Sequence, residues 1–554
     1  MIRETTFLSF LALLSSSQAF LAGTRTSIFA APRYISVKLS STKAQATSHL
    51  EAQASAHAPH VDDLTNVVMK FGGSSLADAE RIRYVADLIA SQKREERQRP
   101  VVVCSAMGSS TNLLLAAAQS ALQGEVDLAV VTALHLDTCD ALGVSDQTRS
   151  EVVALLGGLE KVLSGVMCLG ELSPRSKDLV VSFGERMSVR LMAAQLNLCG
   201  VRAQAFDVWE LGLTTNSEFG DAEILSSSYD AIRRKMAKVF ETNACSPGYE
   251  QCMPLEEERV VPVVTGFLGQ DPQGRITTLG RGGSDLTAAV IAAACGFQEI
   301  QVWKDVNGML TADPRVVPTA VPVPSVTFDE ASELAYFGAK ILHPVSMQPA
   351  RKYNIPVRIK NSYNPSHPGT LIDHEVFGRC EGCLVTAITT KRQQCLIDVV
   401  STRMLGQYGF LATVFSVFEK HKLSVDVVAT SEVSVSLTLG AERMDLIQSA
   451  MSDLSSSKSE FNEESIAEVE VRHGRSILSL IADVTKSSDV MAAVFRILAE
   501  EKIQVEMLSQ GASKVNISLV LKDEDLNRAL RALHGHFFAA EVARAGPFVP
   551  PPEK

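Results

Sequence analysis

From residue 67 onward, short apolar runs alternate with longer segments whose apolar residues recur at helical spacing. The apolar runs at residues 67–71, 100–104, 261–266 and 299–303 predict buried strands. Helical spacing follows the first of them, over residues 76–93. Strands that alternate with helices predict an α/β fold with a mostly parallel central sheet covered by helices. In such a fold, ligands bind at the carboxyl ends of the strands.

The pattern changes after residues 364–383, which are rich in Pro, Gly and His. Between residues 395 and 439 the chain reads as strand, helix, strand, strand, and the same order recurs between residues 476 and 521. This repeat predicts two small βαββαβ units. We therefore expect a presequence at 1–60, an α/β domain at 61–375, a linker at 376–393, repeat units at 394–474 and 475–545, and a tail at 546–554.

The first sixty residues have the composition of a targeting segment. Residues 1–20 combine Arg3, an apolar run and small residues, as in a signal peptide. Residues 21–50 are rich in Ser, Thr and Ala, are basic and contain no acid, as in a transit peptide. Together they resemble the bipartite presequence of algae with secondary plastids, which implies the plastid stroma. Plain secretion is the alternative.

Composition narrows the classes of partner and compartment. The formal net charge of -11 disfavours a nucleic-acid partner or an anionic membrane surface. Ten cysteines, several of them in apolar runs, predict free thiols in a reducing compartment. We interpret Cys380 and Cys383 as two thiols in a linker, with a regulatory disulfide as the alternative, because a lone pair lacks the further ligands of a zinc site.

Two glycine loops carry candidate chemistry, the first at a predicted strand end and both ahead of a predicted helix. In residues 70–75, Gly72 and Gly73 let the backbone approach a phosphate, and Lys70 supplies a positive charge. The loop is no Walker A sequence, and alone it could be a tight turn. In residues 280–285, Arg281 can grip a carboxylate, and Asp285 can orient a lysine or help to hold Mg²⁺. Two such loops in one parallel sheet predict phosphoryl transfer.

Further charged residues follow other predicted elements. We expect Glu185 at the start of an amphipathic helix, where it would hold a substrate ammonium group. The alternative is a surface acid that the helix dipole favours. Lys304, Asp305 and Arg315 follow a strand and would surround a nucleotide, and Lys340 offers a further lysine. We predict no resident metal site.

Nine segments occur in an order and spacing that chance does not explain. They are KFGGSS at 70–75, SAMGSSTN at 105–112, ELSPR at 171–175, SFGER at 182–186, GRGGSD at 280–285, WKDVNG at 303–308, ADPR at 312–315, ELAYFGAKILHP at 333–344 and PGTLI at 368–372. This set resembles the aspartate kinases of the monofunctional, lysine-inhibited kind, within the amino acid kinase superfamily. The resemblance runs from about residue 67 into the C-terminal region.

The resemblance implies the amino acid kinase fold and transfer of the γ-phosphoryl group of ATP, with Mg²⁺, to the β-carboxylate of aspartate. The alternatives are another acceptor within the superfamily and a non-catalytic amino-acid sensor. The resemblance to aspartate kinases implies that Lys70 and Asp285 are catalytic. It also implies that aspartate is bound by Ser105, Thr111, Glu185 and Arg281. For ATP it implies Lys70, Phe71, Gly72, Gly73, Ser74, Lys304, Asp305, Leu310, Arg315, Lys340 and Ile341.

The repeat units resemble ACT domains, and the first matches the segments that bind lysine in feedback-sensitive enzymes. Asp426 would meet the ammonium group of lysine, and the backbone near Gly409 its carboxylate. ACT domains usually pair across subunits, which implies a homodimer or homotetramer. The sequence leaves open whether threonine or S-adenosylmethionine also regulates. The implied lysine residues are Met404, Gly409, Phe410, Leu411, Ser424, Val425, Asp426, Thr430 and Ser431.

Overall fold

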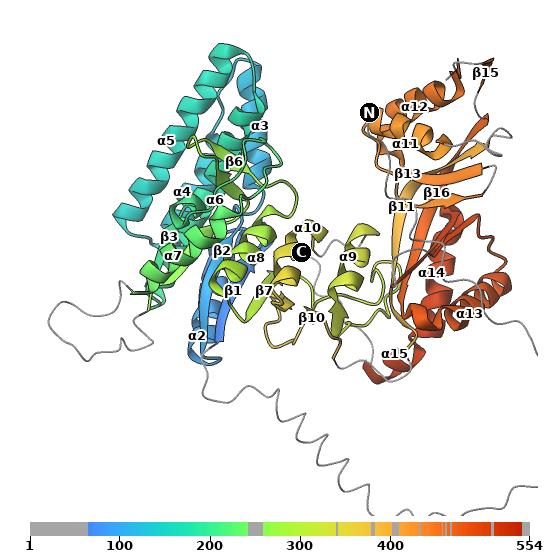
Figure 1. Cartoon of the computed structure of the whole chain (residues 1–554). Coiled ribbons are helices and arrows are strands. Elements are labelled where there is room, and N and C mark those ends of the chain that lie inside the picture. The colour runs from blue at the N-terminus through green and yellow to red at the C-terminus, as the bar shows by residue number, and fades with distance from the viewer. Residues whose placement is uncertain are drawn as a thin grey trace, which may run out of the picture. The chain divides into compact units, whose positions relative to one another are not determined.

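The computed structural model describes most of the chain after the expected presequence (Figure 1). The predictions for residues 1–60, Lys340, Ile341, Cys380 and Met404 fall outside the described residues. The described ranges are 65–241, 259–338, 342–377, 383–400, 409–431, 434–456, 458–459, 462–465, 468–510 and 515–545.

An eight-stranded sheet forms the centre of the N-terminal domain, in the order β3-β4-β2-β1-β7-β9-β10-β8. Neighbouring strands are parallel except for β9 and β10, which confirms the predicted α/β class with a mostly parallel sheet. The strands are β1 Thr65–Phe71, β2 Gln98–Cys104, β3 Ala203–Phe206, β4 Val261–Thr265, β7 Glu299–Lys304, β8 Ser325–Thr327, β9 Val357–Asn361 and β10 Thr370–Asp373.

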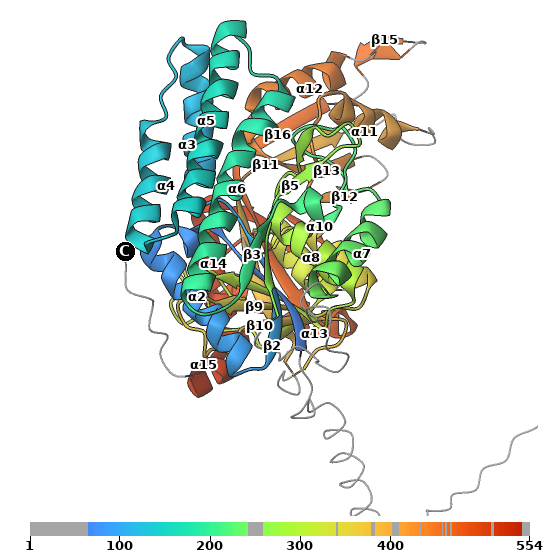
Figure 2. The same cartoon turned by 90° about the vertical axis from the view of Figure 1, so that its left-hand side faces the viewer.

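Helices cover both faces of this sheet (Figure 2). Met69 and Phe71 of β1 face a core shared with helices α2 to α6, whereas Val68 faces a core shared with α7, α8 and α10. Alternating burial on both faces explains why the strands read as unbroken apolar runs. The helices are α2 Ala79–Arg94, α3 Ser110–Leu122, α4 Ala129–Leu142, α5 Asp146–Leu169, α6 Pro174–Leu198, α7 Ser227–Glu241, α8 Gly283–Cys295, α9 Phe328–Tyr336 and α10 Pro344–Lys352.

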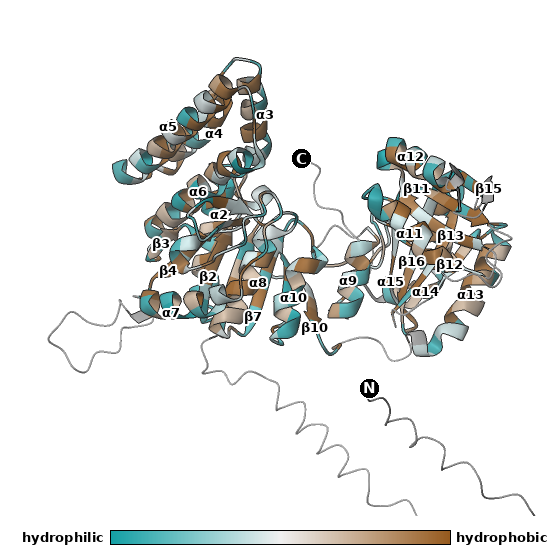
Figure 3. Ribbon diagram, turned by 45° about the horizontal axis from the view of Figure 1, so that its top comes forward, coloured by the Kyte–Doolittle hydropathy of each residue, from teal (hydrophilic) through white to brown (hydrophobic). Residues whose placement is uncertain are grey.

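Helix α5 is the one helix in the described part of the chain that is long and apolar enough to cross a membrane. Its residues mix hydrophilic and hydrophobic types along the helix (Figure 3). Val152, Leu155 and Leu159 lie in the same core cluster as Phe183 of α6. Helix α5 therefore packs as a core helix of the domain.

A second sheet of six strands forms the C-terminal part, in the order β12-β13-β11-β16-β18-β17. Its two central strands, β11 and β16, are long and antiparallel, and both repeat units share them (Figure 1). The strands are β11 Val385–Val400, β12 Val428–Thr430, β13 Ser434–Gly440, β16 Glu468–Ala482, β17 Met507–Ser509 and β18 Asn516–Lys522, and the helices are α11 Phe410–Lys420, α12 Met444–Ser456, α13 Ser487–Glu500 and α14 Asp523–Phe537.

The expected boundaries of the repeat units are wrong at β11. Residues 385–391, which we assigned to a linker, pair with residues 477–482 of β16. Ile388 lies in one core with Leu478 and Leu480 under α13 and α14, whereas Ile397 lies in the core under α11 and α12. The second unit thus begins before the first, which is inserted into it. The polar stretch in the middle of β11 hid this continuity in the sequence.

Within the described ranges, one cysteine departs from the expectation of free thiols. Among the described residues Cys104, Cys139, Cys168, Cys199, Cys295 and Cys395 are free. Cys383 is disulfide-bonded, so the interpretation of this residue as a free linker thiol is wrong. Spacing along the chain is compatible with either state and could not decide between them.

Candidate functional site

A cavity of about 330 Å³ lies where the two glycine loops meet, at the ends of β1 and β2 and the start of α8. Residues that are far apart in the sequence line it, because parallel strands bring their carboxyl ends to one edge. Six of the predicted site residues are among them: Lys70, Gly73, Ser105, Thr111, Glu185 and Asp285.

The two glycine loops are joined by a buried ion pair. Lys70 Nζ lies 2.7 Å from a carboxylate oxygen of Asp285, and the two side chains are only 9% and 10% exposed. Lys70 comes from the end of β1 and Asp285 from the first turn of α8. The carboxylate therefore holds the ammonium group in place at the floor of the cavity, where an incoming phosphate would meet it.

Glu185 lies in the middle of a helix, and our expectation of a helix start is wrong. Helix α6 begins after Ser173, whose side chain accepts a hydrogen bond from the backbone, with Pro174 as first residue. Gly184 allows close packing, since a Cβ there would lie 2.9 Å from Ala106 Cβ. Ala106 N then donates to Glu185 Oε1 at 3.2 Å.

The electrostatic state of Glu185 follows from its burial. The residue is 3% exposed, and burial raises its pKa to about 8. Within the described chain its second oxygen, Oε2, has no hydrogen-bond partner although it is buried. A buried carboxylate without a counter-ion is costly, so the site favours a ligand that brings a positive charge.

The other residues that we predicted to bind the substrate aspartate divide into two groups. Ser105 lines the cavity and donates a hydrogen bond to Ser284 Oγ at 3.0 Å. Arg281 is exposed and does not line the cavity, and it forms no ion pair with the described residues. Sequence reasoning missed Ser284, although it lies within GRGGSD, and Phe267, whose positive φ of 67° no sequence signal indicated.

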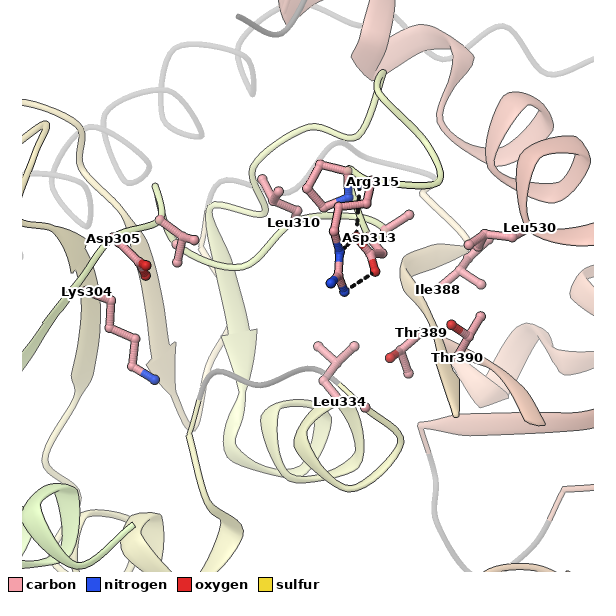
Figure 4. A pocket seen from close by; sticks show the side chains of 15 residues that line it. Lys304, Asp305, Leu310, Asp313, Arg315, Leu334, Ile388, Thr389, Thr390 and Leu530 are labelled. Atoms are coloured by element: carbon pink, nitrogen blue, oxygen red, sulfur yellow. Dashed lines mark hydrogen bonds and ion pairs between the residues drawn. The ribbon is translucent and has the colours of Figure 1, made fainter. Parts of the chain in front are cut away.

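A second cavity of about 340 Å³ contains the predicted nucleotide residues of the later segments (Figure 4). Lys304, Asp305, Leu310 and Arg315 line it. The guanidinium of Arg315 is bound to the carboxylate of Asp313, with 2.7 Å between Nη2 and Oδ2. This contact holds the pKa of Asp313 below its usual range.

Lys304 connects the two cavities electrostatically. Burial lowers its pKa, the negative charge of Asp285 raises it, and the positive charge of Lys70 lowers it further. Asp285 and Lys70 line the first cavity, whereas Lys304 and Asp305, whose negative charge also raises the pKa of Lys304, line the second. Neighbouring strands β1 and β7 explain this arrangement, since they are parallel with Phe71 opposite Trp303.

Two residues predicted to bind ATP, Phe71 and Ser74, do not line the second cavity. The ring of Phe71 is fully buried and stacks on Trp303 at 5.9 Å between centroids, so only its backbone could reach a nucleotide. Ser74 is exposed. Across the described ranges, no group of three His, Cys, Asp or Glu side chains is arranged to hold a metal ion.

The C-terminal part also lines the second cavity, which the sequence did not suggest. Thr389 and Thr390 come from β11 and Leu530 from α14, and Figure 4 shows them on the side opposite Lys304. The same region is tied to the N-terminal domain by a hydrogen bond of 2.9 Å between Thr311 Oγ1 and His534 Nε2.

Among the predicted effector residues, Asp426 has the most distinctive surroundings. Its side chain is 4% exposed, and Lys391 Nζ lies 2.6 Å from one carboxylate oxygen. Tyr336 donates to the other oxygen at 3.1 Å. Phe410 and Val425 pack against one core, whereas Leu411 is 41% exposed. Gly409 directly precedes α11, and the Ser431 hydroxyl is hydrogen-bonded to the Ser434 hydroxyl. Ser424 lies before β12, and Thr430 is the last residue of β12.

Comparisons with known proteins agree with this arrangement. Residues 66–361 match the Amino acid kinase family, and residues 480–537 match the ACT domain. Aspartokinase 3, chloroplastic, of Arabidopsis thaliana is 48% identical over 486 residues, covering 86% of this chain and 82% of the relative. Lysine-sensitive aspartokinase 3 of Escherichia coli is 35% identical over 481 residues, covering 85% of this chain and 99% of the relative.

Two solved structures share the fold over nearly the same range. Escherichia coli aspartokinase III in complex with lysine and aspartate superimposes with a TM-score of 0.67 at 34% identity, covering 85% of this chain and 99% of that one. The same enzyme in complex with aspartate and ADP gives a TM-score of 0.65 at 33% identity, with the same coverage. With both domains matched in sequence and in fold, the chain belongs to the aspartokinases of the amino acid kinase family.

Proposed function

We propose that this aspartokinase transfers the γ-phosphoryl group of ATP to the β-carboxylate of aspartate where its two cavities meet, at Lys70. The observation that carries the proposal is the Lys70–Asp285 ion pair beside Lys304, because it places two lysines between a cavity suited to a small ligand with an ammonium group and a cavity for a nucleotide. Phosphoryl transfer needs mainly positioning and neutralisation of charge.

Aspartate would occupy the first cavity. Its ammonium group would meet the unpaired oxygen of Glu185, and Ser105 and Thr111 would supply hydroxyl contacts. Arg281, at the exposed rim, would close on the α-carboxylate in a two-pronged contact. The β-carboxylate has an ordinary pKa of about 3.9 and is already a nucleophile at neutral pH, so no general base is needed.

ATP would occupy the second cavity with Mg²⁺ on its phosphates. Leu310 would pack against the nucleotide, Lys304 and Arg315 would face its phosphates, and Asp305 would line the entrance. Mg²⁺ usually keeps several waters and takes one or two protein carboxylates, and Asp285, which lines the first cavity beside Lys70, would supply one of them. Lys70 would neutralise the charge that develops on the transferred group.

Lysine would inhibit the enzyme from Asp426, and ACT sheets of two subunits would pair into a homodimer or homotetramer. The relative named lysine-sensitive and the structure solved with lysine support the effector. Chloroplastic relatives from Arabidopsis thaliana support a plastid location. A fusion of residues 1–60 to a fluorescent protein tests the location, and a secreted or cytosolic signal would contradict it.

Trapping the product with hydroxylamine tests the reaction. The full chain with ATP and Mg²⁺ should form aspartyl hydroxamate from aspartate and far less from glutamate, because the extra methylene of glutamate would move its side-chain carboxylate out of line when Glu185 and Arg281 hold the α-amino and α-carboxylate groups. Equal rates with glutamate, or no product with either amino acid, would show that the acceptor is wrong.

A further inference from the structure

Asp426 is the acid that the proposed function assigns to the effector's ammonium group, yet its own chain already supplies a substitute. Lys391 of β11 places an ammonium group 2.6 Å from Asp426 Oδ2. The hydroxyl of Tyr336, on α9, donates a hydrogen bond to the other carboxylate oxygen, Asp426 Oδ1, at 3.1 Å. Lys391 Nζ also lies 5.2 Å from the centre of the Tyr336 ring. The three side chains therefore form one compact group.

Burial of the Asp426 carboxylate opposes the loss of either of its two hydrogen-bond donors, Lys391 and Tyr336. Asp426 is almost fully buried, and an acid in that position requires a partner. Burial and the charge of Asp426 raise the pKa of Tyr336 to about 12, so the phenol keeps its proton and remains a donor. With a donor on each oxygen and a side chain only 4% exposed, Asp426 has little open surface, so we expect the ammonium group of a free amino acid to reach it by replacing one of these donors.

Space for such an exchange exists beside the group. A cavity of about 450 Å³ is bordered by Asp426, Tyr336 and Glu333. This volume is in the range of small-molecule sites. The second carboxylate, Glu333, adds negative charge at the same cavity, which favours a cationic ligand over a neutral one.

Helix α9 carries the consequence of an exchange to the nucleotide cavity. Glu333 and Tyr336 are three residues apart and lie on one face of the helix. Glu333 accepts a hydrogen bond from Asn516 Nδ2 at 2.9 Å, and Tyr336 donates to Asp426, so both fix α9 to the C-terminal sheet. Leu334, between them in the sequence, lines the nucleotide cavity.

We propose that Lys391 is an internal competitor of the effector: it occupies Asp426 in the absence of lysine, and lysine binds by displacing it together with the Tyr336 hydroxyl that anchors α9. This inference rests on the proposed effector site at Asp426. Lys391 and Tyr336 act as positioning residues, because they touch neither aspartate nor ATP. Removing the competitor must therefore strengthen effector binding, whereas removing a mere scaffold would weaken it.

Isothermal titration of the purified full chain with lysine tests the direction. Lys391→Met should bind lysine about tenfold more tightly than the wild type, because one of the two competing donors is gone. Tyr336→Phe keeps the ring and should bind lysine several-fold more tightly, while the rise in the KM for ATP that lysine causes should shrink. Lys420→Met is the matched control, because it breaks the 2.7 Å pair with Asp453 in the same repeat unit away from Asp426.

The outcomes separate the two levels of the argument. Asp426→Asn should abolish lysine binding. If the wild type does not bind lysine, or Asp426→Asn binds it normally, the proposed effector site is wrong and the competitor falls with it. If Asp426→Asn abolishes binding while Lys391→Met and Tyr336→Phe bind lysine unchanged or more weakly, only the competitor role is overturned. A gain in Lys420→Met equal to that in Lys391→Met would also overturn it.

Discussion

The pH dependence of aspartate use should reveal the buried acid Glu185. Burial raises its pKa from an ordinary value near 4.5 to about 8 in the empty site. At pH 7 only about a tenth of the enzyme then carries the charge that an ammonium group requires. The shift corresponds to about 5 kcal/mol against ionisation, a cost that a bound ammonium group would offset.

The two kinetic parameters should respond differently, because one describes the free enzyme and the other the complex. We expect kcat/KM for aspartate to rise about tenfold between pH 7 and a plateau near pH 9, with half of the plateau value near pH 8. In the complex the substrate's charge holds Glu185 ionised, so kcat should change little over the same range. Initial rates with saturating ATP, measured between about pH 6.5 and about pH 9.5, give both parameters.

Two variants decide whether Glu185 is responsible. Glu185→Gln should lower kcat/KM for aspartate and remove the rising limb, because the amide does not titrate. Glu151→Gln is the control: this acid is 45% exposed on α5, pairs with Arg190 and does not line the cavity, so the limb should remain. A flat wild-type profile, or a limb that persists in Glu185→Gln, would refute the assignment of the ammonium site.

Three further changes test other parts of the structure. Lys70→Met should lower kcat by about a hundredfold or more in the hydroxamate assay, because a preorganised charge is removed from the transferred group; near-normal turnover would contradict its role. Arg281→Lys should raise the KM for aspartate several-fold with a smaller change in kcat, since a lysine cannot form the two-pronged contact; an unchanged KM would place the α-carboxylate elsewhere. His534 is buried and its pKa is lowered to about 4, so the unfolded chain binds a proton that the folded chain does not between pH 6.5 and 4. The folded state should therefore lose up to about 3 kcal/mol as the pH falls through that range, and urea unfolding at pH 7 and pH 5 should show a smaller loss for His534→Gln; equal losses would refute this.

The sequence predicted those features that local pattern controls. Alternating burial on β1 and β2 produced apolar runs, and the glycine loops after β1 and before α8 located Lys70 and Asp285, which the structure brings to 2.7 Å. Helix position was predicted less well: Glu185 seemed to begin a helix because the Ser173–Pro174 start lies eleven residues earlier, beyond a stretch without a clear apolar face. The amino acid kinase resemblance supplied residue roles, not contacts.

Features that depend on long-range packing could not be predicted. The two halves of β11 belong to different repeat units, and only their pairing with the distant strand β16 shows it. Asp426 was recognised as an acid for a ligand, but its partners Lys391 and Tyr336 lie 35 and 90 residues away along the chain. A local pattern cannot show which of several distant cations a buried acid takes.

The described residues of the C-terminal part line one of the two cavities and not the other, which predicts whether the effector changes the KM for ATP or the KM for aspartate. Thr389, Thr390 and Leu530 line the nucleotide cavity, whereas every described residue lining the aspartate cavity lies before residue 286. An effector that moves the C-terminal sheet or α9 therefore changes the walls around ATP first. We expect lysine to raise the KM for ATP more than the KM for aspartate. Because coupling between two binding sites is reciprocal, ATP should weaken lysine binding by the same factor by which lysine weakens ATP binding. Titrating lysine with and without a non-hydrolysable ATP analogue measures this coupling, and coupling to aspartate alone would show that the signal reaches the glycine loops by another route.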